Sequence, residues 1–244
     1  MSKIAIGVDH QDFVNSYMIP RFFALRAKMG LDYPRVFALL GNDDPRSEEV
    51  SILEGARHGC WEYVHFRKTL FGDFTVYGYA FVPPTPFLLK DWERYDVSRF
   101  VDPGCLSPEE GRRSVPQTAE ESKYATIAKD LEKLTGADDV SRAILLFHTP
   151  PYETPLDRAA LDGRTVEHVP LDVHIGSIAV RRFIETRSPL VTLHGHVHEA
   201  ARLTGKWKTK LGATVSMTAA HEGPELALVS FDPAEPEGAT RRLI

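Results

Sequence analysis

Three segments of the 244-residue sequence repeat one pattern: an amphipathic helix, a turn, a short apolar strand, and a polar residue where the strand ends. In each segment, hydrophobic residues recur at helical spacing before a glycine or proline breaks the spacing. The helices and the strands that follow them are expected at 12–30 and 35–40, 119–135 and 143–147, and 175–187 and 190–193. Alternation of helices and strands in this order predicts an α/β fold.

Local signals support these boundaries. Thr118 and Glu121 have the spacing of a capping box at the start of the second helix, and Gly136 is placed to end that helix. Pro20 is expected to kink the first helix. The strands are continuously apolar rather than alternating, which predicts a sheet that is covered on both faces. With 43% hydrophobic residues, the chain has enough apolar side chains for a single domain spanning 1–244.

Polar residues gather at the carboxyl ends of these strands, where α/β sheets present functional groups. Taken singly, each residue has a plainer explanation, such as a core histidine or a turn. Their joint occurrence at three strand ends favours a catalytic metal site, since imidazole nitrogens with amide and carboxylate oxygens suit Zn, Fe or Mn. The collected set is Asn42, Asp43, Asp44, His148, His194, His196 and His198.

Composition excludes several classes of protein. The formal net charge is −5, and basic and acidic residues are mixed along the chain, so no nucleic-acid-binding patch is expected. Cys60 and Cys105 are too few for a disulfide framework. No N-terminal apolar stretch has the character of a signal peptide or a membrane span. A cytoplasmic protein without membrane contact is therefore expected.

Three motifs, in order along the chain, resemble those of the calcineurin-like metallophosphoesterase superfamily. "GNDD" (41–44) is similar to its Gly-Asn-(His/Asp) motif, the strand ending in His148 to its isolated-histidine motif, and "GHVH" (195–198) to its Gly-His-x-His motif. The resemblance extends over about residues 11–231. It implies a four-layer α-β-β-α sandwich and a centre of two divalent metal ions, Mn, Fe or Zn.

The resemblance also implies roles for individual residues. Asn42, His148 and His196 would ligate one metal ion and His198 the other. Asp43 stands where many members place a histidine that assists the leaving group, so the catalytic role falls to this carboxylate. His194 matches no ligand of the family and is expected either to support a ligand or to serve the fold alone.

Two motifs of the family, Asp-x-His and Gly-Asp, are not found. The nearest candidates are Asp9, His10 and Asp12, whose spacing differs. Either these residues are surrogate ligands on a rearranged first strand, or the fold lacks its first β-α-β unit. The second explanation is favoured because residues 12–25 look like the helix that normally follows the Gly-Asp loop. Missing strands would expose sheet edges, which a partner, such as another copy in an oligomer, or a rearrangement would have to cover.

Two functions follow from this resemblance. The first is a metal-dependent phosphoesterase that hydrolyses a small phosphate monoester or diester through a metal-activated water. The second is a catalytically impaired or inactive relative that retains a partial metal site for binding or regulation, as the two missing motifs suggest.

Further segments carry expectations about the fold and the substrate. We expect a covering loop or a solvated connection at 83–117 and substrate contacts from 149–158. An alternating strand is expected at 74–82, a closing hairpin between 213–219 and 226–231, and a C-terminal tail at 232–244. His168 and His174 could face the site, but a surface position is favoured for each.

Overall fold

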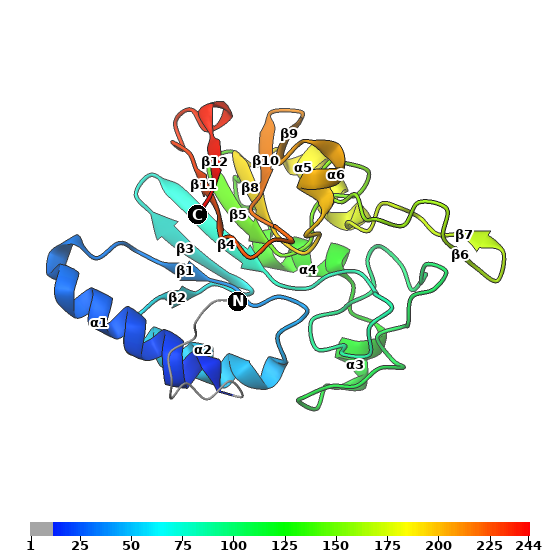
Figure 1. Ribbon diagram of the computed structural model, residues 1–244, viewed down its shortest axis with the longest axis horizontal. Helices are drawn as coiled ribbons and strands as arrows, with labels where there is room; N and C mark the ends of the chain where they lie inside the picture. Colours follow the sequence, from blue (N-terminus) through cyan, green and yellow to red (C-terminus); the bar gives the residue numbers. More distant parts are fainter. Residues whose placement is uncertain (1–11) are drawn as a thin grey trace.

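A six-stranded mixed sheet lies at the centre of the computed structural model, which describes residues 12–244 (Figure 1). Its four inner strands are parallel, and each outer strand is antiparallel to its neighbour. In spatial order the strands are β3 (Arg67–Phe71), β4 (Phe74–Tyr79), β5 (Ala143–Phe147), β8 (Val191–His194), β10 (Thr214–Thr218) and β9 (Lys208–Leu211). The predicted strands at 143–147 and 190–193 are confirmed, and β4 lies within the strand predicted at 74–82.

The central strands bury both of their faces because successive side chains of a strand point to opposite sides of the sheet. Val76 and Ile144 belong to one hydrophobic cluster, together with Val215. Their neighbours Tyr77 and Leu145 belong to a second cluster. This arrangement confirms that the apolar strands are covered on both sides.

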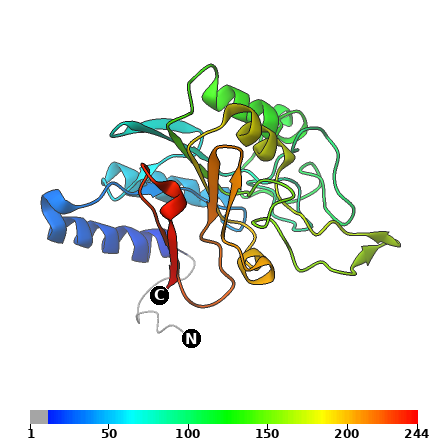
Figure 2. The same cartoon turned by 90° about the horizontal axis from the view of Figure 1, so that it is seen from above.

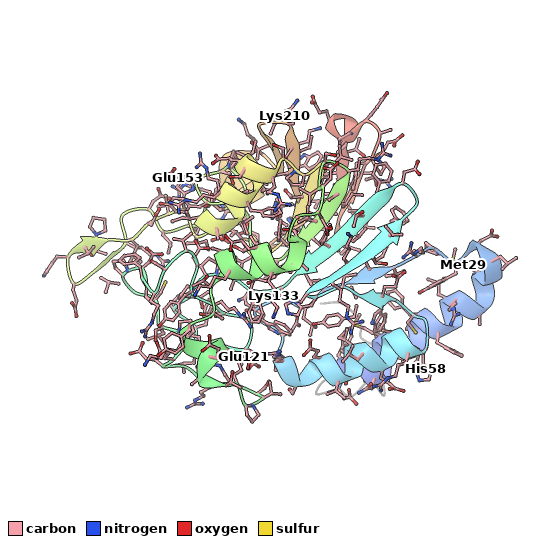
Figure 3. All side chains as sticks on the ribbon, turned by 180° about the vertical axis from the view of Figure 1, so that it is seen from behind. Met29, His58, Glu121, Lys133, Glu153 and Lys210 are labelled. Atoms are coloured by element: carbon pink, nitrogen blue, oxygen red, sulfur yellow. The ribbon has the colours of Figure 1, made fainter. Side chains whose placement is uncertain are left out.

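Two helices cover one face of the sheet. They are α4 (Ile127–Thr135) and α5 (Ile178–Arg187), which Figure 2 shows together on the same side and Figure 3 shows from behind, with Lys133 on α4. Thr126 and Ser177 cap them, accepting hydrogen bonds from the third backbone N–H beyond. Helix α5 buries four apolar residues, namely Ala179, Val180, Phe183 and Ile184.

The other face packs partly against a C-terminal hairpin of β11 (Ala227–Ser230) and β12 (Thr240–Leu243). Beyond β3 and β4, a smaller layer contains the parallel pair β1 (Phe37–Ala38) and β2 (Glu62–Tyr63), with α1 (Ile19–Met29) and α2 (Glu49–Arg57) beside it (Figure 1). The remaining elements are η1 (Val14–Met18), η2 (Gly30–Asp32), η3 (Arg46–Glu48), α3 (Ala119–Lys123), β6 (Thr165–Val166), β7 (Val169–Pro170), α6 (Ala200–Thr204) and η4 (Pro236–Gly238).

The helical segments differ in detail from their predictions. The capping box of Thr118 and Glu121 is present, and the helix ends at Gly136 as predicted. However, the helix predicted over 119–135 is divided at residues 124–126, where Thr126 forms a β-bridge with Tyr95. The helix predicted to kink at Pro20 instead changes from the π-helical η1 to α1 one residue earlier. Tertiary pairing therefore overrides local helix propensity at Thr126.

Two predictions about the C-terminal strands are wrong. β10 pairs with β8 and with β9, so it forms no hairpin with β11. β11 instead pairs with β12, which lies in the segment 232–244 that was expected to be a tail. Both errors have one cause: the partner of a strand is set by packing across the whole sheet, and neighbouring strands in sequence need not pair.

The loop 83–117 is ordered by bridges and buried side chains. β-Bridges join Val82 to Glu93 and Leu89 to Arg112. Lys90 Nζ lies 2.6 Å from Glu93 Oε2, and both side chains are almost completely buried. Asp96 contributes its carboxylate to the N-terminus of α5. Among residues 12–244, no helix has both the length and the apolarity needed to cross a bilayer.

Candidate metal centre

Asn42 lies just after β1, in a turn that its neighbours hold closed. The Asp44 carboxylate accepts a hydrogen bond from the Gly41 N–H at 2.7 Å, and the Asp44 N–H donates to the Gly41 carbonyl at 3.2 Å. Asn42 is 7% exposed, whereas Asp43 and Asp44 are exposed. The turn therefore fixes the Asn42 amide near the end of its strand.

Two histidines from other strand ends converge on this amide. His148 follows β5 directly, and its Nε2 lies 2.8 Å from Asn42 Oδ1. His196 lies in the loop after β8, and its Nδ1 lies 2.8 Å from the same oxygen. The two histidines are 106 and 154 residues away from Asn42 in the chain. The structure thus brings together three of the predicted ligands.

The backbone around the two imidazole rings leaves little free space. A Cβ at Gly41 would lie 2.6 Å from the His148 ring, and one at Gly195 would lie 3.1 Å from it. The Gly195 N–H donates to the His148 carbonyl at 3.0 Å. His196 has a φ of 70°, a left-handed conformation that is uncommon for a non-glycine residue. Such local strain is typical of functional sites.

Both histidines are neutral at physiological pH. Burial lowers the pKa of His148 to about 4, assisted by the charge of His198. Burial also lowers the pKa of His196 to about 3, with further contributions from His148 and His198. Only neutral imidazole can bind a metal ion, so these shifts keep both rings in the form required of a ligand.

Asp43 and His198 lie at the exposed margin of this group. Asp43 accepts a hydrogen bond from the Asn42 side-chain nitrogen at 3.2 Å, and the His198 side chain is exposed. Within residues 12–244, no three His, Cys, Asp or Glu side chains gather as a metal site. His198 is near enough to influence the pKa of both other histidines, but it does not complete such a group.

The other predicted candidates have different positions. Asp9 and His10 lie outside the described residues. Asp12 accepts hydrogen bonds from the backbone and the side chain of Asn15, at the start of the first helix. His194 is 5% exposed; its Nδ1 lies 2.9 Å from the carbonyl oxygen of Thr149, beside His148.

The converging atoms have the chemistry of a metal-ligand set. One amide oxygen and two imidazole nitrogens form an intermediate donor set that suits Zn, Fe or Mn. In the present arrangement each ring can donate an N–H to Asn42 Oδ1. If each ring instead has its proton on the other nitrogen, the two facing nitrogens present lone pairs beside the same oxygen, as a metal ion requires. Asn42, His148 and His196 therefore fit one divalent ion.

One polar contact near the loops of His148 and His196, that between His174 and Asp157, was not predicted from the sequence. His174 was expected at the surface, but its side chain is only 29% exposed and its Nδ1 lies 2.8 Å from Asp157 Oδ1. Asp157 is fully buried. The sequence gives no spacing signal for this pair, because 17 residues separate its members. His168, in contrast, is exposed as predicted.

Comparisons with known proteins identify a fold and no family. No family model and no curated protein matches the chain. One crystal structure aligns over 96% of this chain and 74% of its own, with a TM-score of 0.53 and 16% identity. The crystal structure of TT1561 of Thermus thermophilus aligns over 92% and 79%, with a TM-score of 0.48 and 18% identity. The first similarity shows a shared fold alone, and the second is too weak to extend it.

Proposed function

We propose that this protein is a metal-dependent phosphoesterase that hydrolyses a small phosphate monoester or diester. The observation that carries the proposal is the approach of His148 and His196 to the one buried oxygen of Asn42, each at 2.8 Å. Three separate strand ends supply these atoms, in the order of the family motifs that they resemble. The mixed sheet with flanking helices is consistent with the four-layer sandwich that the proposal includes.

In this proposal each residue has a separate task. Asn42, His148 and His196 hold one divalent ion, and His198 contributes to a second. When bound, the ions would polarise a phosphoryl oxygen and lower the pKa of a water molecule. The partly exposed His148 and His196 remain neutral and can therefore bind the ion, and the exposed Asp43 is available to a substrate from solvent.

Metal content and hydrolysis test the proposal together. The purified protein, loaded with Mn²⁺ and desalted, should retain metal by mass spectrometry and should hydrolyse bis(p-nitrophenyl) phosphate or p-nitrophenyl phosphate. Asn42→Ala should lose most of the bound metal and most of the hydrolytic activity, because the ring nitrogens of both histidines lie against the Asn42 side-chain oxygen. Asn15→Ala, a surface substitution distant in sequence from the ligands, is the matched control. A metal-loaded protein that hydrolyses neither ester would contradict the proposed activity.

A second candidate is a non-catalytic relative that uses a partial metal site for binding or regulation. The observation that favours it is that, within residues 12–244, the converging group holds only two histidines and an amide, while His198 stands apart. Metal content separates the two candidates. About two equivalents with turnover support the enzyme, and one equivalent without turnover supports the binding protein.

A further inference from the structure

A buried carboxylate and a histidine form a second chemical pair beside the candidate metal centre. The carboxylate of Asp157 accepts hydrogen bonds from the backbone N–H groups of Glu153, Thr154 and Gly176, at 3.0, 2.9 and 3.2 Å. It also lies 2.8 Å from Nδ1 of His174. The backbone of three residues therefore holds the carboxylate in place. Through its contact with Nδ1, the carboxylate holds the imidazole ring in one orientation.

The second ring nitrogen of His174 is available for chemistry. Within residues 12–244, Nε2 has no hydrogen-bond partner. It is also absent from the buried polar atoms that lack a partner, so it is not a buried atom. A histidine that is bonded to a carboxylate through Nδ1 has a defined tautomer and presents Nε2 for proton transfer. The charged or titratable groups around the ring are Asp157, Asp172, Tyr152 and Arg158.

The segment that carries His174 packs against the loop of the candidate ligands. Ile175 contacts the cluster that contains Val197, the residue between His196 and His198. The Glu199 carboxylate accepts a hydrogen bond from the Ala160 N–H at 3.1 Å, and the neighbouring Ala159 N–H donates to the Val173 carbonyl at 2.8 Å. His174 therefore lies on a segment that packs against the loop of His196 and His198.

The same segment also adjoins the loop after His148. A Cβ at Gly176 would lie only 2.6 Å from the carbonyl oxygen of Pro150, and Ser177 exchanges backbone hydrogen bonds with Pro150 and Tyr152. In Figure 3, Glu153 marks this loop beside α5, where it forms an ion pair with Arg181. Both ligand-bearing loops thus border the segment of His174.

An adjoining cavity of about 270 Å³ has a mainly apolar wall. Tyr152 lines the cavity, and its ring lies edge-on to His174 at a centroid distance of 6.1 Å. The apolar lining comes from Pro83, Pro84, Val97, Phe100 and Ile178. These side chains suit the hydrocarbon part of an alcohol, and the Tyr152 ring lies between this lining and His174 as their shared neighbour.

We infer that His174, oriented by Asp157, protonates the departing alcohol of a phosphate ester whose apolar group occupies this cavity. The inference rests on the proposed phosphoesterase function and specifies its substrate class: an ester of a weakly acidic alcohol with an apolar group. Asp157 acts as a positioning residue through the ring of His174.

The step balances in atoms and charge. The oxygen of water forms a bond to phosphorus, and the bond from phosphorus to the alcohol oxygen breaks with its electron pair on that oxygen. The alcohol oxygen takes the proton from Nε2 of His174. The attacking water releases one proton to solvent, and solvent returns one to His174, so the products are the free alcohol and the hydrolysed phosphate.

The test compares two esters that differ in their need for a proton. Phenyl phosphate releases phenol, which is a weak acid, so the departing oxygen needs a proton. p-Nitrophenyl phosphate releases p-nitrophenolate, which is stable as an anion. His174→Asn keeps a donor for Asp157 and removes Nε2. The expected result is a fall in kcat/KM for phenyl phosphate of about 100-fold or more relative to p-nitrophenyl phosphate. His168→Asn, an exposed histidine nearby in sequence, should leave the ratio unchanged.

The outcomes separate this inference from the function on which it rests. Equal losses on the two esters, or no loss on either, would overturn the role of His174 and leave the phosphoesterase proposal standing. Absence of metal-dependent turnover of either ester by the unmodified protein would overturn both. Circular dichroism and metal content identify a folding defect, and His174→Gln then gives an independent comparison, since its amide N–H is far too weak an acid to protonate an alcohol oxygen.

Discussion

The Asn42 side-chain oxygen has two lone pairs, and two histidine ring nitrogens each lie 2.8 Å from it. Both hydrogen bonds require a proton on the facing nitrogen, Nε2 of His148 and Nδ1 of His196. A metal ion needs a lone pair on those same nitrogens. Ion binding therefore requires the other neutral tautomer of each ring, in which the proton is on the nitrogen that faces away from Asn42.

The two histidines should be separately necessary for metal binding. His148→Ala and His196→Ala are each expected to remove most of the bound metal, because the amide and one remaining ring are too few ligands to replace the lost one. The measurement is metal content by mass spectrometry after equilibration with Mn²⁺ or Zn²⁺ and desalting. Retained stoichiometry in either variant would show that the ligand is misassigned.

Two other histidines provide the comparison. His58→Ala removes an exposed imidazole that pairs with Glu54, so metal content should not change. His194→Ala should likewise retain metal, because Nδ1 and Nε2 of His194 already lie against Thr149 and Thr192. A loss for His194→Ala as large as that for His196→Ala would place the wrong member of the triplet at the centre.

His65 should make stability depend on pH. It lies among aromatic rings, with Trp92 at 5.0 Å, and burial lowers its pKa to about 3. The unfolded chain takes up a proton near pH 6.5, whereas the folded state does not, so stability falls as the pH decreases toward 3. This one residue should cost up to about 2 kcal/mol of unfolding free energy between pH 8 and pH 5.

Urea unfolding at pH 8 and pH 5 measures this effect. His65→Asn places an acceptor near the Ala80 N–H, which donates to His65 at 3.1 Å, and it removes the titrating group. The variant should lose less stability on acidification than the unmodified protein does, while the exposed His168→Asn should follow the unmodified protein. An unchanged pH dependence in His65→Asn would refute the assignment.

At the scale of elements, one carboxylate joins the loop 83–117 to helix α5. Asp96 accepts hydrogen bonds from the Ser177 hydroxyl at 2.5 Å and from the Ile178 N–H at 2.7 Å. Asp96→Ala should cost about 1–3 kcal/mol, because it removes a negative charge and acceptors from a helix N-terminus. Chemical denaturation measures the loss, with the exposed Asp73→Ala as the control. Equal stability of the two variants would rule out this capping role.

The loop itself should resist cleavage despite its lack of helix and strand. Lys90 is completely buried and Arg94 nearly so, whereas the Arg99 side chain is 51% exposed. Brief trypsin digestion followed by mass spectrometry should therefore show cleavage after Arg99 before cleavage after Lys90 or Arg94. Early cleavage after Lys90 would mean that the buried pair with Glu93 does not order the loop.

Elements with local signals were predicted well from the sequence. Thr118 and Glu121 close a capping box through side chains three residues apart, and Gly136 ends its helix through backbone freedom. The partner of β10 depends instead on Val191 and Lys210, to which it is joined across the sheet. Nothing within 213–231 encodes those contacts, so the predicted hairpin was wrong.

At the scale of the whole molecule, the same distinction applies to the candidate site. Polar residues at strand ends predicted that His148 and His196 would meet, because β5 and β8 are parallel neighbours in one sheet. Asn42 reaches them from β1, which pairs with β2 in the smaller layer, so its approach depends on how the two layers pack. Asp157 and His174 meet through the folding of a long loop, which has no periodicity from which a contact could be predicted.

The long separation along the chain between Asn42 and its two histidine partners also affects when the centre can form during protein synthesis. During synthesis at roughly 5–20 residues per second, the 154 residues from Asn42 to His196 take roughly 8 to 30 s to emerge. Throughout that interval the amide has at most one of its two histidine partners. A nascent chain could recruit an ion to this centre only after His196 has been made, when four of the six strands of the central sheet already exist.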